Sequence, residues 1–491
     1  MLQNLFKSCL MAYLSMIWID AAADVNTYFN SIKTNPNALY AFFKTMPTGG
    51  ELHYHFSGSS YPEDLIKHVR SGNYCVIPST LELTPFDKEC EGVHSKTFFS
   101  DDRHYPQAIR AWSMTDFIAN KESNHDHFFS VFGKVAPVYD EFYTSLLAEM
   151  MQRAANQHEL YMEVMMMNLS SPDSYAKLTK STPTWVDKKH ILLTNKDFQK
   201  NIKQQIDASN HYLKQVHHVL GCDTNSKQPV CSLDVRFQFW VKREESRDSV
   251  FAQALTGFAA AAQSSNIVGV NLVQPERGVI STRDFNEHMR IFEFLHAAYP
   301  QVHIALHAGE LEPNTSLPHD LSFHIRNSVY IGHAERIGHG VDIVHEDQSS
   351  ELVKHMAKQQ VAVEINLTSN RTILSIFGNQ HPILYYLQHG VPIVLSTDDE
   401  GILHTDLTRQ YVDAAFTYGI DYQTLKNIDR NSLTYSFLSG KSIWVDPAKS
   451  IIAPACRDRM SLACREFIKT SDKARLQWAL ENKLSEFEAT F

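Results

Sequence analysis

Short apolar segments alternate with longer amphipathic segments through most of this chain, and that alternation constrains the fold more than any other feature. Eight segments have the length and apolar content of buried strands: 51–56, 160–167, 232–240, 267–273, 302–307, 336–340, 361–367 and 392–397. Amphipathic segments such as 197–220 and 282–299 lie between them. Strands that alternate with helices form βαβ units around a parallel sheet. Eight such units predict an α/β fold of the (β/α)8 barrel type.

An open, doubly wound sheet is the alternative architecture for the same alternation. Such a sheet usually carries a glycine-rich phosphate-binding turn after its first strand. The corresponding stretch here, "HFSGSS" at 55–60, lacks the G-x-G-x-x-G spacing, so the barrel is the favoured prediction.

Three regions lie outside the strand–helix units. Residues 24–45 predict an N-terminal helical extension with a break at Asn35–Pro36. Residues 61–115 are rich in turns and form a predicted insertion after the first strand. Residues 440–491 contain a charged C-terminal helix, and the barrel domain is assigned to 46–491.

Residues 1–23 have the pattern of a secretory signal peptide. Lys7 precedes an apolar run from Cys9 to Ile19, and Ala21–Ala23 supplies small residues for cleavage. The run is too short to span a bilayer and no longer one follows, so stable membrane insertion is not expected. A buried N-terminal helix is the alternative interpretation.

Six cysteines remain when Cys9 is removed with that segment, and an even number fits a disulfide framework. They fall into three close couples, so local bridging is the preferred connectivity: Cys75–Cys90, Cys222–Cys231 and Cys456–Cys464. Disulfides persist in oxidising compartments, which predicts a periplasmic or secreted protein. Free thiols in the cytosol are the alternative.

The charge pattern limits the kinds of molecule that the chain is expected to bind. The chain has 45 basic and 55 acidic residues, a formal net charge of −10, and no cluster of lysine and arginine. A nucleic-acid surface needs a basic face to neutralise phosphates. No nucleic-acid partner is therefore expected, and a small-molecule ligand is favoured.

Polar residues gather where four of the predicted strands end. The first strand ends with His53 and His55, the fifth with "HAGE", the sixth with "GHG" and the eighth with "STDDEG". Each fragment alone has a structural explanation, such as a capped turn or a solvated histidine. In a (β/α)8 barrel, however, the carboxyl ends of the strands carry the chemistry, and these fragments all lie at such ends.

Histidine pairs by themselves are weak signals in a chain with 25 histidines among 491 residues. His125 and His127 form a similar pair in a polar stretch, and we interpret that pair as chance. His53 and His55 differ because residues two apart on a strand point to the same side. The other strand ends offer His307, Glu310, His339, Asp398 and Asp399. Three histidines and one carboxylate from such a group suit one zinc ion with an open position for water, and the remaining histidine and carboxyl group could act as acid and base.

Five stretches in this chain resemble the adenosine deaminase family, in the branch that includes secreted, growth-factor-type deaminases. They are "MPTGGELHYHFSGS", "LHAGE", "ERIGHGVDI", "VEINLTSN" and "LSTDDEG", and they follow the family order over nearly the whole chain after residue 46. The resemblance implies hydrolytic deamination of adenosine, and of 2′-deoxyadenosine, to the inosine product and ammonia.

The resemblance also implies roles for individual residues. His53, His55, His307 and Asp398 are implied as zinc ligands. Glu310 is implied as the acid that protonates purine N1 while water attacks C6. His339 is implied as the group that orients this water and stabilises its developing charge, and Asp399 as the partner of purine N7.

Two positions depart from the family pattern. The family often has an acidic residue where this chain has Ser57, and a glycine where it has Gln274. Both positions are implied to contact substrate, so the exact nucleoside is left open. The secreted branch also uses an N-terminal helical segment in dimerisation, which makes a homodimer a prediction here.

Two other function classes stay open. Another hydrolase on the same barrel could act on adenine, a modified adenosine or a different amine. A two-metal amidohydrolase would need a bridging lysine on the fourth strand, and "IVGVNLVQPE" has none. An extracellular binding or signalling protein on an inactive scaffold is the second class, although the complete ligand set argues against it.

Overall fold

The barrel prediction is confirmed in a computed structural model that describes residues 25–118, 122–166, 172–447, 449–458 and 461–491. Eight parallel strands follow one another around the sheet in chain order. They are β1 (Thr48–His55), β5 (Glu159–Met165), β6 (Asp234–Lys242), β7 (Ile267–Val273), β8 (His303–Ala308), β9 (Arg336–His339), β10 (Ala362–Ile365) and β11 (Ile393–Leu395). The predicted signal peptide, 1–23, lies outside the described residues.

The sheet closes where the chain beyond β11 meets the end of β1. A parallel bridge joins Tyr54 to Asp398, and the backbone N–H of His55 donates to the carbonyl of Asp398 over 2.9 Å. This closure brings the first and last strand ends together. It therefore places the histidines of β1 beside the acidic residues that follow β11.

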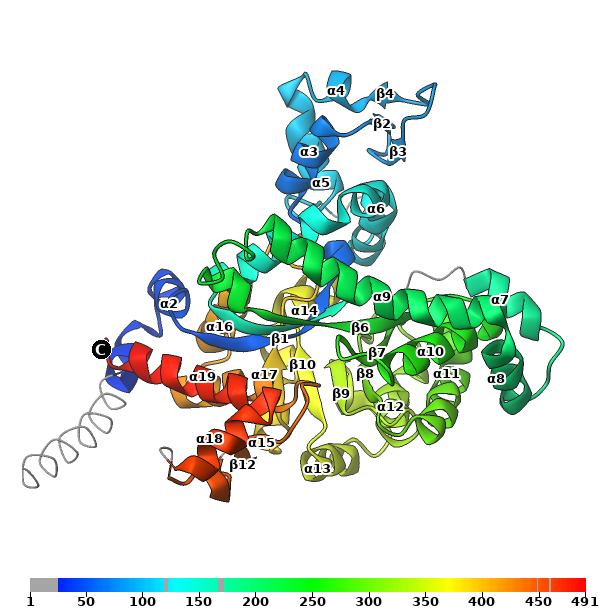
Figure 1. Cartoon of the computed structure of the whole chain (residues 1–491). Coiled ribbons are helices and arrows are strands. Elements are labelled where there is room, and N and C mark those ends of the chain that lie inside the picture. The colour runs from blue at the N-terminus through cyan, green and yellow to red at the C-terminus, as the bar shows by residue number, and fades with distance from the viewer. Residues whose placement is uncertain (1–24, 119–121, 167–171, 448, 459–460) are drawn as a thin grey trace, which may run out of the picture.

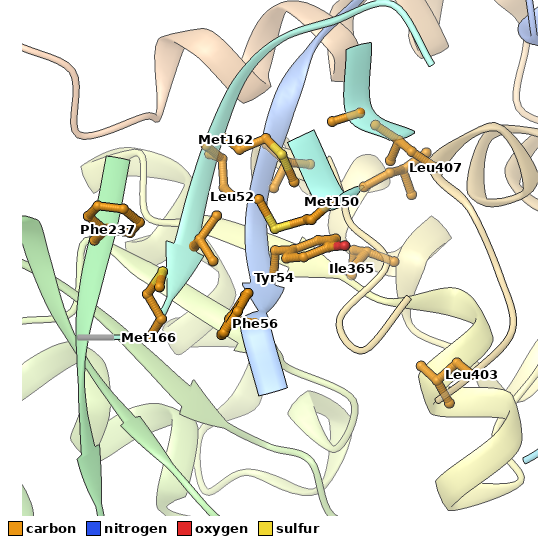
Figure 2. Close-up of a cluster of buried hydrophobic side chains, with 14 of the residues drawn as sticks. Leu52, Tyr54, Phe56, Met150, Met162, Met166, Phe237, Ile365, Leu403 and Leu407 are labelled. Carbon is orange, nitrogen blue, oxygen red and sulfur yellow. The ribbon is translucent and has the colours of Figure 1, made fainter. Parts of the chain in front are cut away.

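The alternation of side chains along β1 explains why its polar residues face inward. Leu52 and Tyr54 contribute to the apolar layer between the sheet and the surrounding helices, beside Met150 and Met162 (Figure 2). His53 and its neighbours two residues away point to the opposite side, toward the barrel axis. Every residue of β1 is buried, as expected for a parallel sheet covered on both faces.

Helices surround the barrel (Figure 1). Those that follow β5 and the later strands include α7 (Pro172–Thr179), α8 (Trp185–Thr194), α9 (Lys196–Val219), α10 (Arg247–Ala261), α11 (Val279–Ala298), α12 (His324–Tyr330), α13 (Ser349–Gln359), α14 (Leu367–Leu374), α15 (Ile383–Gln388), α16 (Leu407–Phe416) and α17 (Tyr422–Thr434). The amphipathic segments 197–220 and 282–299 correspond to α9 and α11. Side-chain caps begin several of them: the Ser246 hydroxyl, for example, accepts from Ser249 N at the start of α10.

The segment between β1 and β5 forms a separate layer that projects from the barrel (Figure 1). It contains α3 (Pro62–Ser71), α4 (Ser95–Phe98), α5 (Tyr105–Ala111) and a small antiparallel sheet of β2 (Tyr74–Val76), β3 (Leu83–Pro85) and β4 (Val93–His94). The long helix α6 (Asn124–Asn156) then returns toward β5, with Pro137 inside it and a kink at Phe142.

The two ends of the described chain pack together on one side of the barrel. Helix α2 (Pro36–Phe43) contacts α16, and its Phe42 packs against the C-terminal helix α19 (Asp472–Glu488). In the helix at 25–32, the ring of Phe29 lies 6.0 Å from that of Tyr422 in α17. Aromatic rings join them: the centroid of Phe42 lies 5.1 Å from Phe487 and 5.3 Å from Phe491. The hairpin of β12 (Trp444–Asp446) and β13 (Ile451–Ile452) leads into α18 (Leu462–Lys469).

The structure pairs six cysteines in the expected local pattern, as Cys75–Cys90, Cys222–Cys231 and Cys456–Cys464. The first disulfide lies in the projecting layer, the second joins the turn after α9 to the segment before β6, and the third connects to α18. Among the helices of the described residues, none is both long enough and apolar enough to cross a membrane.

Candidate active site

The four residues predicted to bind a metal converge at the carboxyl end of the barrel. His53 and His55 come from β1, His307 from β8, and Asp398 from the turn after β11. One ligand atom from each lies within 4.8 Å of the ligand atoms of the others. Asp398 Oδ1 is 3.3 Å from Nε2 of both His53 and His55, and the Nε2 atoms of His55 and His307 are 3.0 Å apart. We call these four residues the ligand cluster.

Burial lowers the pKa of His55 and of His307, which favours the neutral imidazole that a metal ion binds. His53 is fully buried, and its Nε2 has no hydrogen-bond partner among the described residues. Burial lowers the pKa of His53, but interactions with Asp398 and Glu364 outweigh burial and raise it to about 10. The arrangement of imidazole nitrogens and a carboxylate around one point therefore fits a divalent cation.

A second layer of side chains orients the two fully or nearly fully buried histidines. His53 Nδ1 donates to Glu364 Oε2 of β10 over 2.7 Å, and His307 Nδ1 donates to Asn271 Oδ1 of β7 over 2.9 Å. Each bond occupies Nδ1 and leaves Nε2 for the cluster, which is how a protein fixes the tautomer of a metal-binding imidazole. Burial raises the pKa of Glu364, but Arg336 and His53 outweigh burial and hold it below its usual value.

Glu310 and His339 lie beside the ligand cluster and complete a group with Asp398. His339 Nε2 is 3.9 Å from Glu310 Oε2 and 3.8 Å from Asp398 Oδ2. Burial and the charge of Asp398 raise the pKa of Glu310 to about 8, so its carboxyl group holds a proton at neutral pH. Burial lowers the pKa of His339 to about 3, so its ring is neutral, and Asn370 Nδ2 donates to its Nδ1 over 3.0 Å.

Backbone strain accumulates at the same place. His339, Asp398 and Gln274 have φ angles of +72°, +69° and +82°, the left-handed region that non-glycine residues rarely adopt. Residues held in such conformations cluster at functional sites because the surrounding structure fixes them there. The strain turns these three side chains out of the regular strand direction at the strand ends.

Asp399 is buried beside the ligand cluster, and its Oδ1 has no hydrogen-bond partner among the described residues. Burial and the adjacent Asp398 charge hold the pKa of Asp399 well above its usual value, which makes it a hydrogen-bond donor. A Cβ atom at Gly58 would lie 1.7 Å from Asp399 Oδ1. Glycine at position 58 is therefore what lets this carboxyl group reach its place.

Gln274 follows β7 and already has a partner for its side-chain oxygen. Gln274 Oε1 accepts from the backbone N–H of Glu244 over 2.8 Å, and its carbonyl accepts from Arg243 Nε over 2.8 Å. Its positive φ suits the glycine that the family resemblance implies here.

A cavity of about 510 Å³ opens over these residues. Ser57, Gln274, Glu310, His339, Asp398 and Asp399 contribute to its lining, together with His55 and His307. One side of α6 forms another part of the lining, and we call it the α6 wall: Phe128, Phe129, Phe132, Ala136, Tyr139, Asp140 and Tyr143.

Helix α6 is held across the barrel by the loops that follow four strands. At its start, Asn124 Nδ2 donates to Thr372 O at the end of α14, and Asp126 lies 3.6 Å from Arg277 in the loop after β7. Near its end, Arg153 donates to Ser59 O over 2.6 Å and to Glu400 Oε2 over 3.1 Å. The helix thus partly covers the carboxyl end of the barrel.

The sequence analysis did not identify the α6 wall, nor the supporting residues Glu364 and Asn271. The supporting residues had a recognisable signal, because each is a polar side chain within an otherwise apolar strand. His125 and His127 lie outside the ligand cluster. The His127 ring contacts Glu122 and the carbonyls of Arg110 and Ser113 at 2.8 to 3.0 Å, which gives it a structural explanation.

Fold and site together define a (β/α)8 barrel with a candidate metal centre at the carboxyl ends of its strands. A family model described as "Adenosine deaminase" matches residues 105–443, more than half of the chain. The chain belongs to the adenosine deaminase family. His53 and His55 precede the matched range, yet the fold brings them to His307 and Asp398 inside it.

The chain matches adenosine deaminases over part of their length. It is 38% identical over 140 residues to the enzyme of Klebsiella pneumoniae (strain 342) and 34% identical over 140 residues to that of Edwardsiella ictaluri (strain 93-146). Each match covers 28% of this chain and 38% of the relative, so the chain spans about two fifths of the relatives it matches.

Solved structures show a similar fold over nearly the whole chain. An adenine deaminase from Arthrobacter aurescens has a TM-score of 0.54 at 16% identity, covering 90% of this chain and 98% of that one. The apo N6-methyl-AMP deaminase of Arabidopsis thaliana has a TM-score of 0.53 at 16% identity, with 90% and 98% coverage. At this identity the likeness supports the fold alone.

Proposed function

We propose that this protein is a zinc-dependent hydrolase that deaminates adenosine, and 2′-deoxyadenosine, to inosine or 2′-deoxyinosine and ammonia. The observation that carries the proposal is the ligand cluster with Glu310 beside it in one cavity. Three imidazoles and one carboxylate suit a single zinc ion more than magnesium or calcium, which prefer oxygen ligands.

His53, His55, His307 and Asp398 would hold the zinc. When bound, zinc acts as a Lewis acid that lowers the pKa of a coordinated water toward about 7. In the reaction, the oxygen of water adds to C6 of the purine and the C6–N bond breaks. Of the two protons of water, one leaves with the amino group as ammonia and the other returns to Glu310, which has given its own proton to N1.

The protein's own residues move the protons and orient the base. The protonated carboxyl of Glu310 donates to purine N1, which makes C6 more electrophilic. Neutral His339, whose Nδ1 accepts from Asn370, keeps its proton on Nε2 and orients the attacking water with it. The raised pKa of Asp399 keeps a proton available for purine N7. Ser57 and Gln274 are proposed contacts to the rest of the nucleoside.

The test is the ultraviolet absorbance of adenosine after addition of purified, zinc-loaded protein, with a chelator-treated sample as the control. A zinc-dependent fall in the adenosine band supports the metal, the reaction and the substrate together. Absence of change with zinc bound would reject adenosine. The substrate panel would then extend to adenine and N6-modified adenosine, the alternative that the Gln274 and Ser57 departures favour.

The disulfides support a location in the periplasm or outside the cell, since such bonds persist in oxidising compartments. We propose a signal peptide at 1–23, a helical extension at 24–45 and a barrel domain at 46–491 with a disulfide-bearing insertion at 61–115. A homodimer stays a prediction, and light scattering of the purified protein tests it.

A further inference from the structure

Glu276 is a buried carboxylate that the proposed chemistry does not use. It lies in the loop after β7 and is 1% exposed. Its Oε1 accepts from the backbone N–H of Gly309 over 3.0 Å and from His324 Nδ1 over 2.7 Å. Its Oε2 accepts from the backbone N–H of Glu310 over 2.8 Å. The carboxylate therefore binds the backbone of the residue proposed as the catalytic acid.

The backbone after β8 needs such a partner because it leaves the sheet there. Gly309 has a φ of +76°, so the chain turns away from the neighbouring strand immediately before Glu310. Backbone N–H groups at a buried strand end must find acceptors elsewhere. Glu276 supplies acceptors to two successive N–H groups, which fixes both the position and the direction of the turn.

The other side of Glu276 is fixed as well. His324 donates to it, and the His324 ring is stacked on Phe285 with centroids 3.8 Å apart and planes at 4°. Burial raises the pKa of Glu276, but His324 and Arg243 outweigh burial and hold it below its usual value. An ionised carboxylate accepts hydrogen bonds more strongly than a neutral amide oxygen, so its charge strengthens the hydrogen bonds from the two N–H groups.

Arg243 holds the preceding residues of the same segment. Its Nη1 donates to the carbonyl of His307 over 3.1 Å, and its Nε donates to the carbonyl of Gln274 over 2.8 Å. Two side chains therefore hold the end of β8. Arg243 binds the backbone of His307, a proposed zinc ligand, and Glu276 binds the backbone of Glu310, the proposed acid. We therefore expect loss of the Arg243 contact and loss of the Glu276 contact to have different effects on the site.

We propose that Glu276 is a positioning residue for Glu310: by accepting from the N–H groups of Gly309 and Glu310, it sets where the acid side chain stands relative to the substrate. The inference rests on the proposed deaminase function for its kinetic test. It assigns Glu276 to proton delivery and not to metal binding.

The experiment is Glu276→Gln, which keeps the length of the side chain but replaces one acceptor with an amide NH₂ that faces an N–H group. We expect kcat for adenosine to fall about 10–100-fold, because a positioned general acid contributes about 10²–10⁴-fold and a displaced acid loses part of that contribution. KM should change less than about threefold and zinc should stay near one per chain, because the ligands and the cavity lining are intact. An unchanged kcat, or loss of zinc, would overturn the proposal.

Asp429→Asn is the matched control. Asp429 is also a buried carboxylate that accepts from a backbone N–H, that of Gly49 at 2.6 Å, but it lies near the start of β1 and not at a strand's carboxyl end. It should lower stability and leave kcat within about twofold. If the control lowers kcat as much as Glu276→Gln does, general destabilisation explains both and the proposal fails.

A double variant separates positioning from structural support. In a Glu310→Gln background there is no acid left to position, so adding Glu276→Gln should cause no further loss of the residual rate. A full additional loss would show that Glu276 acts elsewhere. Should Glu276→Gln not fold, Glu276→Asp takes its place: shortening the side chain withdraws the carboxylate from the two N–H groups, and an unchanged kcat would again overturn the proposal.

Hydrogen exchange gives a readout that needs no substrate. Glu276→Gln should speed exchange of the amides in the 307–312 segment at least about tenfold, while Asp429→Asn should not. Unchanged protection there would contradict the positioning role even if adenosine is not the substrate. Turnover of adenosine by the parent protein tests the proposed function separately, so the two failures can be told apart.

Discussion

The α6 wall lines the same cavity as His55, His307 and Asp398 of the ligand cluster, but the wall and the cluster owe their positions to different parts of the fold. The ligand cluster sits on strand ends of the closed barrel, and buried partners such as Glu364 and Asn271 hold its imidazoles. The α6 wall belongs to a helix inserted between two strands, and loop contacts at its two ends hold it. The barrel therefore fixes the ligand cluster, while the added helix shapes the cavity beside it.

This difference has a functional consequence. Substitutions in the ligand cluster should abolish the reaction regardless of the substrate. Substitutions in the α6 wall should change which nucleoside binds and how tightly, because aromatic rings contribute contact area and not proton transfer. Substitutions at the strand ends therefore give the strongest tests of this difference between the ligand cluster and the α6 wall.

His307→Ala should give the largest effect. It removes one of three imidazoles, so zinc should be lost on dialysis and deamination should fall to the background rate. Metal content by atomic absorption and the absorbance assay measure the two losses on the same sample.

His127→Ala is the control for that loss. His127 is also buried, at 5% exposure, but its ring contacts Glu122 and backbone carbonyls. The control should keep zinc and activity while losing some stability. Retention of zinc by His307→Ala would mean that His307 is not a ligand.

Glu310→Gln should have the next largest effect. It should distinguish strand-end residues that transfer protons from those that bind zinc. The amide cannot deliver a proton to N1, so kcat should fall about 10²–10⁴-fold. Zinc should remain at one per chain, since Glu310 lies outside the ligand cluster. Metal content and kcat are again measured together, and an active Glu310→Gln protein would refute the acid assignment.

Much of the barrel and the strand-end site could be predicted because both depend on short-range patterns. Strands recur as apolar runs, and the rule that barrel chemistry lies at carboxyl strand ends converts His53, His307 and Asp398 into one expected site. The strand ends themselves were less accurate: β10 stops at Ile365 and β11 at Leu395, two residues before the predicted ends. The chain leaves the regular sheet there to present residues such as Asp398 in a left-handed conformation.

The α6 wall could not be predicted in the same way. Its rings lie on one side of a helix, and aromatic residues at helical spacing usually pack into a core. Their placement over the barrel depends on contacts between segments far apart in sequence, such as Asn124 with Thr372. The hydrogen bond from the backbone of Glu310 to Glu276 likewise depends on a loop that follows a neighbouring strand.

Phe132→Ala tests the α6 wall with a smaller expected effect. Phe132 packs against Phe128 with ring centroids 5.4 Å apart and lines the cavity. Losing its contact area should raise KM for adenosine about tenfold, equivalent to about 1.4 kcal/mol, and should change kcat little. Phe377→Ala, at a ring that is 54% exposed, serves as the control. A fall in kcat at unchanged KM would show that the wall takes part in the chemistry after all.

Breaking the Cys75–Cys90 disulfide should have the smallest effect on activity. This change tests whether the position of the α6 wall depends on the projecting layer. The bond closes a loop with a sequence separation of 15, so substituting both cysteines by serine should lower the free energy of unfolding by about 3 kcal/mol or less.

The projecting layer touches α6 through α3 and through the His127 ring, which contacts Ser113 O, yet Cys75 and Cys90 do not line the cavity. KM and kcat should therefore stay within about twofold of the parent values, as they should when Cys456 and Cys464, at a separation of 8 on the far C-terminal segment, are replaced instead. A rise in KM confined to the Cys75–Cys90 variant would mean that the layer holds α6 in place. The cavity would then depend on three supports: the barrel, the helix and the layer above it.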